Sequence, residues 1–256
     1  MIVAGLQLDI AWEAPDENFA RATALAEQAA RDNARLLVLP EMFATGFSMD
    51  AEVIARHAER IQEFLGKLAE RLDVWVMGSY AEPGNRPRNA CSLYDPQGNE
   101  QLRYHKIHPF TLAGENDHFD GGTVLPTADV EGVRVTPLIC YDLRFPEPFR
   151  AAAERTDLFC VLANWPQQRR NAWRVLLRAR AIENQCYVLG VNRVGDAEGL
   201  SHAGDSGIVE PLGETVAEVA DGSAVLSGDV DPARVAATRG LFSFLADRRP
   251  DVYREL

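Results

Sequence analysis

The 256-residue sequence has little positive charge and no long apolar run. No stretch approaches the roughly 20 consecutive apolar residues that a membrane-spanning helix needs. The 38 acidic residues outnumber the 26 basic ones, and the formal net charge at pH 7 is -12. Such an acidic surface repels the phosphates of nucleic acids and of anionic lipids. We therefore expect neither nucleic acid nor a membrane to be a partner of this protein.

Cysteine is sparse as well, and its four occurrences follow no disulfide pattern. The segment 1–10 lacks the basic start of a secretory signal, so we expect a cytoplasmic protein with free thiols. No His-Glu-x-x-His motif occurs, and no cysteine lies near His105 and His108, which argues against a metal site. The four cysteines are Cys91, Cys140, Cys160 and Cys186.

Helix-like and strand-like segments alternate along the chain. Apolar residues spaced three and four apart indicate helices, whereas short apolar runs and strict alternation indicate strands. This alternation predicts an α/β layered fold, and three consecutive strands between residues 74 and 106 predict mixed sheets. The expected helices cover 16–33, 51–72, 147–154 and 171–184. The expected strands cover 1–10, 35–40, 74–80, 91–95, 101–106, 133–139, 157–163, 187–192, 208–211 and 215–219.

Three reactive side chains lie where predicted strands end, which is where active residues of α/β domains gather. Glu41 and Cys140 each follow an apolar strand, and Lys106 closes another. A lone glutamate or lysine is more often a solvated surface residue. A turn such as the one at Cys140 exposes a nucleophile and directs backbone N–H groups at its ligand. The other three cysteines are expected to be buried structural residues.

Together the three side chains could perform nucleophilic catalysis. A free thiol has a pKa near ~8.5, so it needs a base that takes its proton or a cation that stabilises the thiolate. Glu41 could be the base and Lys106 the cation. Attack on an amide carbonyl also creates an oxyanion, for which the Lys106 ammonium and the backbone N–H of Tyr141 are candidate donors.

The motifs around these residues resemble the nitrilase, or carbon–nitrogen hydrolase, superfamily. Glu41 lies in Leu-Pro-Glu-Met-Phe, Lys106 in His-Lys-Ile-His and Cys140 in Ile-Cys-Tyr-Asp-Leu-Arg-Phe-Pro-Glu. The resemblance covers nearly the whole chain, and its set of ordered motifs is highly specific. Segments similar to the omega-amidase branch are 164–166, 179–185, 190–195, 204–206 and 247–253.

The resemblance implies a four-layer α-β-β-α sandwich with mixed sheets. It implies one carbon–nitrogen hydrolase domain over residues 1–256, assembled as a homodimer, with residues 240–256 as a tail used in packing or dimerisation. The implied partners are a small amide and water. The implied reaction passes through a thioester, releases ammonia and requires no metal or organic cofactor.

The same resemblance implies a role for each catalytic residue. Glu41 would be the general base, Lys106 the oxyanion stabiliser and Cys140 the nucleophile. A further glutamate, Glu115, would position Lys106 or the substrate.

Omega-amidases hydrolyse the terminal amide of alpha-keto acid amides such as alpha-ketoglutaramate and alpha-ketosuccinamate. Such a substrate carries a carboxylate, and arginine can hold a carboxylate with two hydrogen bonds. Arg169 and Arg144 are the candidate binding residues, although Arg144 could instead lock its turn by pairing with a protein carboxylate. Trp165 and Phe43 are also expected to contact the substrate.

Other functions remain open at this point. Ala172 and His202 replace a histidine and an aromatic residue of the family pattern, so the amide could instead be an N-carbamoyl amino acid, a deaminated peptide or a nitrile. A non-catalytic binding protein on this scaffold is less favoured, because the catalytic set is retained. The segment 204–207, Gly-Asp-Ser-Gly, resembles the serine motif of trypsin-like proteases. The chain lacks their disulfides and all-β pattern, so we expect a tight turn there.

Overall fold

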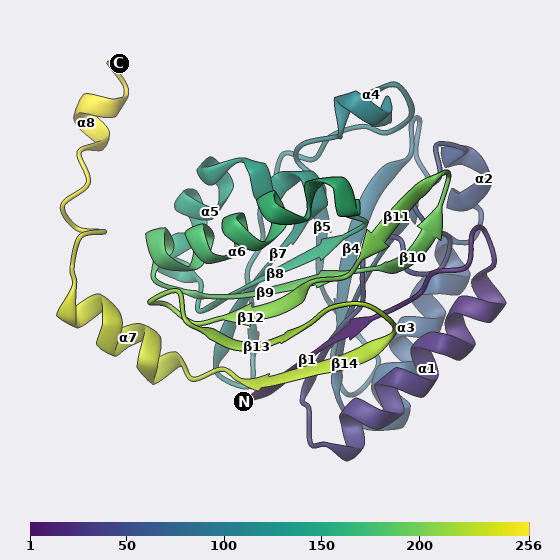
Figure 1. Cartoon of the computed structure of the whole chain (residues 1–256), viewed down its shortest axis with the longest axis horizontal. Coiled ribbons are helices and arrows are strands. Elements are labelled where there is room, and N and C mark those ends of the chain that lie inside the picture. The colour runs from purple at the N-terminus through teal and green to yellow at the C-terminus, as the bar shows by residue number, and fades with distance from the viewer. Residues whose placement is uncertain (256) are drawn as a thin grey trace.

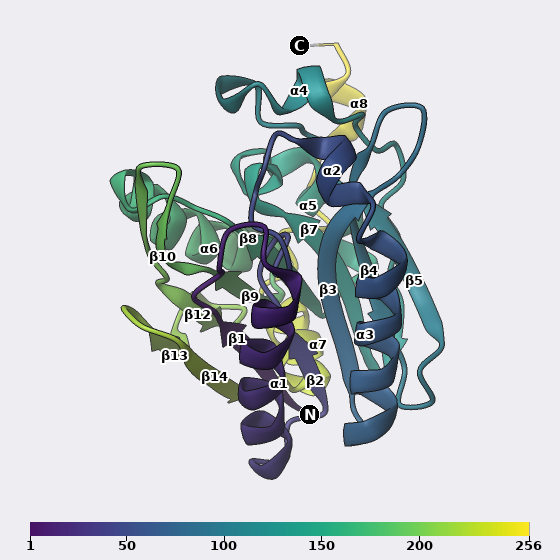
Figure 2. The same cartoon turned by 90° about the vertical axis from the view of Figure 1, so that its right-hand side faces the viewer.

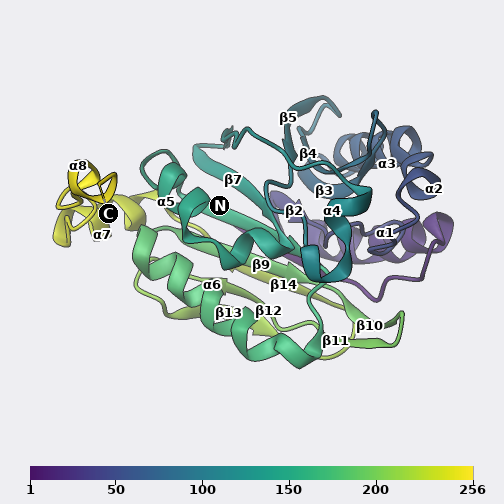
Figure 3. The same cartoon turned by 90° about the horizontal axis from the view of Figure 1, so that it is seen from above.

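Two six-stranded β-sheets pack face to face in the computed structural model, which describes residues 1–255 (Figure 1). The first sheet has the strand order β14-β1-β2-β3-β4-β5, and the second has the order β13-β12-β9-β8-β7-β6. Helices cover the outer face of each sheet, as the view from above shows (Figure 3). The predicted α-β-β-α sandwich is confirmed.

The first sheet is mixed, as predicted. Its strands β1, β2 and β3 are parallel, whereas β4 and β5 continue as an antiparallel meander and β14 pairs antiparallel with β1. The helices α1 (Pro15–Arg31) and α3 (Ala58–Leu72) pack next to each other on its outer face (Figure 2). The strands are β1 (Ile2–Gln7), β2 (Leu36–Val38), β3 (Trp75–Glu82), β4 (Arg88–Tyr94), β5 (Glu100–His105) and β14 (Ala224–Asp229).

The second sheet has a parallel centre and antiparallel edges. Its strands β7, β8 and β9 are parallel, and β6 and β12 pair antiparallel with the two ends of this group. The helices α5 (Pro146–Ala152) and α6 (Arg170–Asn184) lie on its outer side (Figure 3). The strands are β6 (Ala128–Val130), β7 (Val133–Ile139), β8 (Leu158–Ala163), β9 (Tyr187–Asn192), β12 (Ser206–Val209) and β13 (Thr215–Val219).

Alternate strand residues face the space between the sheets. In β1, Val3 belongs to this inner core while Ala4 packs under the helices, as the twofold period of a strand requires. A Cβ atom on Gly5 would lie 2.9 Å from Val191 Cγ2, so glycine lets the two sheets approach closely here. Three of the cysteines are fully buried in the inner core, as expected, namely Cys91, Cys160 and Cys186.

The segment 51–72 forms two helices instead of the single predicted one. The short helix α2 (Ala51–Ala55) packs in a separate apolar cluster with Met42 and Phe119, whereas α3 packs against the first sheet. Because these clusters lie apart, one straight helix could not bury both apolar faces. Packing therefore overrides the helical pattern between the two clusters.

Several short elements fall outside the predicted ones. The hairpin of β10 and β11 forms its own two-stranded sheet, and two helices follow the last strand (Figure 1). No helix within residues 1–255 is long and apolar enough to cross a membrane. The strands β6 and β14 were not predicted either, and the other additional elements are α4 (Glu115–His118), β10 (Val194–Ala197), β11 (Leu200–Ala203), α7 (Pro232–Leu241) and α8 (Pro250–Tyr253).

Candidate active site

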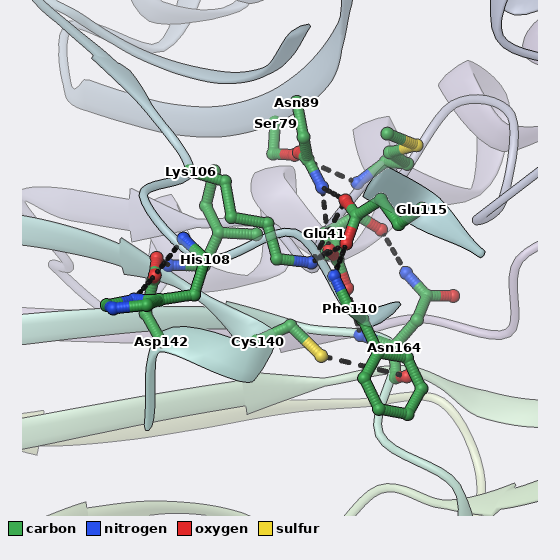
Figure 4. A network of polar contacts seen from close by, with 12 residues as sticks. Glu41, Ser79, Asn89, Lys106, His108, Phe110, Glu115, Cys140, Asp142 and Asn164 are labelled. Atoms are coloured by element: carbon green, nitrogen blue, oxygen red, sulfur yellow. Dashed lines mark hydrogen bonds and ion pairs between the residues drawn. The ribbon is translucent and has the colours of Figure 1, made fainter. Parts of the chain in front are cut away.

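The predicted catalytic side chains lie together across the interface of the two sheets (Figure 4). Glu41 follows β2 and Lys106 follows β5 in the first sheet, and these strands run in the same direction. Cys140 follows β7 in the second sheet. The site thus needs both sheets, because neither sheet alone carries the thiol, the carboxylate and the ammonium.

Lys106 joins two buried carboxylates. Its Nζ atom lies 3.0 Å from Glu41 Oε1 and 2.8 Å from Glu115 Oε2. All three side chains are at most 1% exposed. Glu115 lies at the start of α4, and this direct contact is one through which it could position Lys106.

Burial and mutual contact set the charges of this group. Burial alone would lower the pKa of Lys106, but Glu115 and Glu41 outweigh that effect and raise it. Lys106 therefore carries a positive charge at neutral pH. Burial raises the pKa of Glu115, and the attraction of Lys106 offsets only part of that rise.

Two asparagines orient Glu41. Asn89 Nδ2 donates to Glu41 Oε1 at 2.8 Å, and the backbone N–H of Asn164 donates to Oε2 at 2.9 Å. The Asn164 side chain also donates to the backbone oxygen of Glu41. Sequence reasoning did not identify Asn89, although it shares a strand face with the core residues Cys91 and Leu93. A polar residue on a strand face that is otherwise apolar is the sequence feature that could have identified Asn89.

Cys140 lies in a strained turn beside the carboxylates. It begins a 3₁₀ helix, Cys140–Arg144, with a φ of 44°, which costs a non-glycine residue roughly 1–3 kcal/mol. Its thiol lies 3.9 Å from the backbone oxygen of Asn164. Burial and the nearby Glu41 raise the pKa of the thiol well above its usual value, although Lys106 acts in the opposite direction. The resting group is therefore a thiol, so attack requires removal of its proton.

Asp142 ties the lysine segment to the cysteine turn. It is fully buried and accepts hydrogen bonds from the Tyr104 hydroxyl at 2.6 Å and from the backbone N–H of His108 at 3.0 Å. It also accepts from the backbone N–H of Ile139 at 3.0 Å. Because Lys106 lies between two of these donors, one carboxylate fixes both strand ends relative to each other.

A pocket lined in part by aromatic rings opens beside Cys140 and Lys106. Besides these two, four more of the predicted residues line it, namely Tyr141, Trp165, Arg144 and Arg169. The β10–β11 hairpin forms part of its rim through Ala197, Glu198, Leu200 and His202. Sequence reasoning missed its aromatic residues Trp12, Phe47 and Phe110, which come from loops without a distinctive pattern.

The two pocket arginines contact aromatic rings instead of carboxylates. Arg144 Cζ lies 4.8 Å from the centre of the Trp165 ring, and Arg169 Cζ lies 5.3 Å from that of Phe110. Neither guanidinium forms a salt bridge or hydrogen bond with any residue of the described chain. The alternative in which Arg144 pairs with a protein carboxylate is therefore wrong. Both cations are available to an anion in the pocket.

Phe43 lies away from the pocket, contrary to the prediction. Its ring packs near Phe19 and Phe64 under the helices of the first sheet, with centroid distances of 6.2 and 5.9 Å. The preceding residue, Met42, has a φ of 44°, so the chain turns sharply between Glu41 and Phe43. Phe47 lines the pocket instead, with its ring centre 5.1 Å from Lys106 Nζ.

The two departures from the family pattern lie in different surroundings. Ala172 in α6 packs against the inner core and does not line the pocket, whereas His202 is buried in the pocket wall. Burial and the neighbouring Arg193 lower the pKa of His202 to about 4. His202 is therefore neutral at pH 7, and only this departure can touch a ligand.

The Gly-Asp-Ser segment forms no hydrogen-bonded tight turn, contrary to the expectation, because the chain passes directly from β11 into β12. Gly204 and Asp205 have φ values of 69° and 56°, and Ser206 is buried. The Ser206 hydroxyl donates to Gln7 Oε1 at 2.8 Å and accepts from the backbone N–H of Asn192 at 3.0 Å. As for metal binding, residues 1–255 contain no group of three or more His, Cys, Asp or Glu side chains that could hold an ion.

Known proteins share both the sequence and the fold. The sequence model of the carbon-nitrogen hydrolase family matches residues 2–240. The omega-amidase YafV of Yersinia enterocolitica is 42% identical over 193 residues, which cover 74% of each chain. The 2-oxoglutaramate amidase of Bacillus subtilis is 32% identical over 256 residues, which cover 98% of each chain.

Solved structures agree with these sequence comparisons. XC1258 from Xanthomonas campestris, a CN-hydrolase superfamily protein, has a TM-score of 0.91 and 33% identity over 97% of each chain. An amidase from Nesterenkonia sp. has a TM-score of 0.89 and 26% identity, covering 100% of this chain and 95% of its own. The resemblance is thereby confirmed, and the chain belongs to the carbon–nitrogen hydrolase, or nitrilase, superfamily in its omega-amidase-like branch.

Proposed function

We propose that this protein is a cysteine amidohydrolase that converts a small alpha-keto acid amide to the acid and ammonia. The substrate would be of the alpha-ketoglutaramate or alpha-ketosuccinamate type. The observation that carries the proposal is that Glu41, Lys106 and Cys140 meet beside a pocket with two unpaired arginines. The names of the YafV and Bacillus subtilis relatives support the same substrate class.

In the first half of the reaction, the Cys140 sulfur attacks the amide carbon while its proton passes to Glu41. The Lys106 ammonium and the Tyr141 backbone N–H stabilise the resulting oxyanion. The carbon–nitrogen bond then breaks, ammonia leaves with the proton from Glu41, and a thioester remains on Cys140. The raised pKa of the thiol favours proton transfer during attack over a thiolate formed beforehand.

In the second half, Glu41 takes a proton from water, and the water oxygen attacks the thioester carbon. The carbon–sulfur bond breaks, the proton returns to sulfur, and the acid leaves. Glu115 holds the Lys106 ammonium in place throughout, because both of its oxygens lie within 3.1 Å of Nζ. This scheme uses no metal or organic cofactor.

The decisive experiment is a screen for ammonia release from keto acid amides, simple amides, N-carbamoyl amino acids, a deaminated peptide and nitriles. We expect the highest kcat/KM for a keto acid amide. If the protein preferred an N-carbamoyl amino acid, a deaminated peptide or a nitrile, that compound class would replace the keto acid amide as the proposed substrate. Release from none of them would favour the non-catalytic binding protein.

The pocket arginines predict how the substrate carboxylate is held. Arg169→Ala should raise KM for a keto acid amide by roughly 10- to 100-fold, because a hydrogen bond to a charged group contributes about 1.5–3 kcal/mol. A neutral amide of similar size should be much less affected. Arg178→Ala is the matched control, since Arg178 lies exposed on α6 outside the pocket. Equal losses for charged and neutral amides would contradict a carboxylate-binding role of Arg169.

We further propose a homodimer that works in the cytoplasm. The helix α6 leaves Val175 55% and Ile182 48% exposed, and the predicted tail leaves Leu241 75% and Phe242 56% exposed. A second copy could cover such apolar side chains. The four unpaired cysteines support a reducing compartment.

A further inference from the structure

We propose that Asn89 is a positioning residue that keeps the Glu41 and Glu115 carboxylates ionised side by side, and thereby sets the acidic limit of activity. The inference rests on the proposed function, because it assigns Glu41 the role of base. Asn89 is 1% exposed and lies near the start of β4, which carries none of the residues in the proposed reaction.

The two N–H bonds of one amide group are divided between two carboxylates. Asn89 Nδ2 donates to Glu41 Oε1 at 2.8 Å and to Glu115 Oε1 at 3.1 Å (Figure 4). The Ser79 hydroxyl donates to Asn89 Oδ1 at 3.1 Å, which fixes the end of the amide that faces the carboxylates. The backbone oxygen of Asn89 also accepts from the Lys106 N–H at 2.9 Å.

The local charge balance explains why a neutral donor is needed. The ionisable groups around Asn89 are Glu41 after β2, Lys106 after β5, Glu115 in α4 and Cys140 after β7. With Cys140 as a thiol, two carboxylates share one ammonium. Burial and like charge both favour protonation of one carboxyl group. An amide that donates to both carboxylates opposes protonation without adding charge, so Glu41 stays available as a base.

The test is the pH dependence of kcat/KM for ammonia release. Asn89→Ala should shift the acidic limb upward by about one pH unit, because each carboxylate loses a hydrogen bond that favours its charged form. Asn89→Asp should shift it at least as far, because an added carboxylate cannot donate. On the acidic side of the limb, kcat/KM should fall about tenfold, and it should recover at higher pH.

Ser92→Ala is the matched control. Ser92 is buried in the same strand but lies on its other face, where its hydroxyl contacts the Tyr80 hydroxyl at 2.9 Å. This variant should lose stability without moving the acidic limb. Ser79→Ala, which frees the Asn89 amide to rotate, should shift the limb in the same direction by less. It also serves as the second variant should Asn89→Ala fail to fold.

A readout without substrate separates this inference from the proposed function. Carboxyl ¹³C NMR of glutamate-labelled protein follows the protonation of Glu115, whose pKa burial already raises. We expect this titration to move to higher pH in the Asn89 and Ser79 variants, even if no amide is hydrolysed. Unchanged titration in folded variants would overturn the role of Asn89. Absence of ammonia release from wild-type protein would overturn only the proposed function.

Discussion

At the scale of single residues, Cys140 differs from the other cysteines in access more than in acidity. It is 9% exposed and lines the pocket, whereas Cys91, Cys160 and Cys186 are fully buried. Burial raises the pKa of all four thiols. We expect iodoacetamide to label Cys140 first, at a rate that still increases with pH above the ~8.5 of a free thiol.

Peptide mass spectrometry after short exposures between pH 7 and 10 would measure this labelling. A rate for Cys140 that levels off below pH 8 would indicate a preformed thiolate. Equal labelling of all four cysteines would show that Cys140 is no more accessible to the reagent than the other three. Cys140→Ala should abolish ammonia release in either case, and undiminished release would exclude Cys140 as the nucleophile.

Asp142 provides a second prediction at the residue scale. Asp142→Asn places an amide donor against at least one of the groups that hydrogen-bond to the carboxylate, namely the Tyr104 hydroxyl, the His108 ring and two backbone N–H groups. We expect a loss of about 1–3 kcal/mol in stability and a fall in kcat of at least tenfold, because the Lys106 and Cys140 segments lose their common anchor. Tyr104→Phe removes one donor only and should be milder in both assays. A destabilised variant with normal kcat would argue against a role of Asp142 in holding the Lys106 and Cys140 segments together for catalysis.

The candidate site was predictable to the extent that its residues lie in ordered motifs. Glu41, Lys106 and Cys140 follow strands, so their sequence positions carry information about their place in the fold. Asn89 and the backbone N–H of Asn164 reach Glu41 only through the pairing of strands and the spacing of the sheets, neither of which is local in sequence.

At the scale of elements, strand pairs and packing explain the remaining differences. The pattern of apolar residues was enough to predict the central strands, because that pattern directly reflects which of their residues are buried. The β10–β11 hairpin is short and half exposed, so it lacks that pattern. The helix break after Ala55 also has no glycine or proline signal, since contacts with two different clusters cause it.

The parallel pair β7 and β8 contains an ion pair that should respond to acid. Asp157, just before β8, lies 2.6 Å from Arg134 Nη2 in β7. Burial opposes ionisation of Asp157, but hydrogen bonds from Arg134 outweigh it, so its pKa is lowered. A lowered folded-state pKa stabilises the protein above the unfolded value of ~3.9, and this stabilisation is lost as the pH falls through the folded-state pKa.

We therefore expect Asp157→Asn to reduce stability at pH 7 by about 1–2 kcal/mol, with a difference from wild type that shrinks below pH 4. Urea unfolding at several pH values would measure it. Asp32→Asn, at an exposed position just after α1, is the control and should change little. A difference that stays constant down to pH 2 would show that the ion pair is not responsible.

At the scale of the whole molecule, we propose that residues 1–256 form one domain, because the inner core takes residues from both sheets. Thermal unfolding should then be one transition by circular dichroism and by loss of activity. Light scattering with size exclusion should give twice the 28.3 kDa chain mass. Deletion of residues 243–256 should weaken the dimer if the tail contributes to it, and a monomer at micromolar concentration would contradict the dimer.

Because the site lies between the two sheets, it is complete only when both sheets have formed and packed together. A folding intermediate with one finished sheet would hold part of the charged cluster but no functional centre, so it could not cleave substrate prematurely. Recovery of turnover during refolding should therefore lag behind recovery of secondary structure. Amide hydrolysis would therefore begin only when the two sheets have packed against each other.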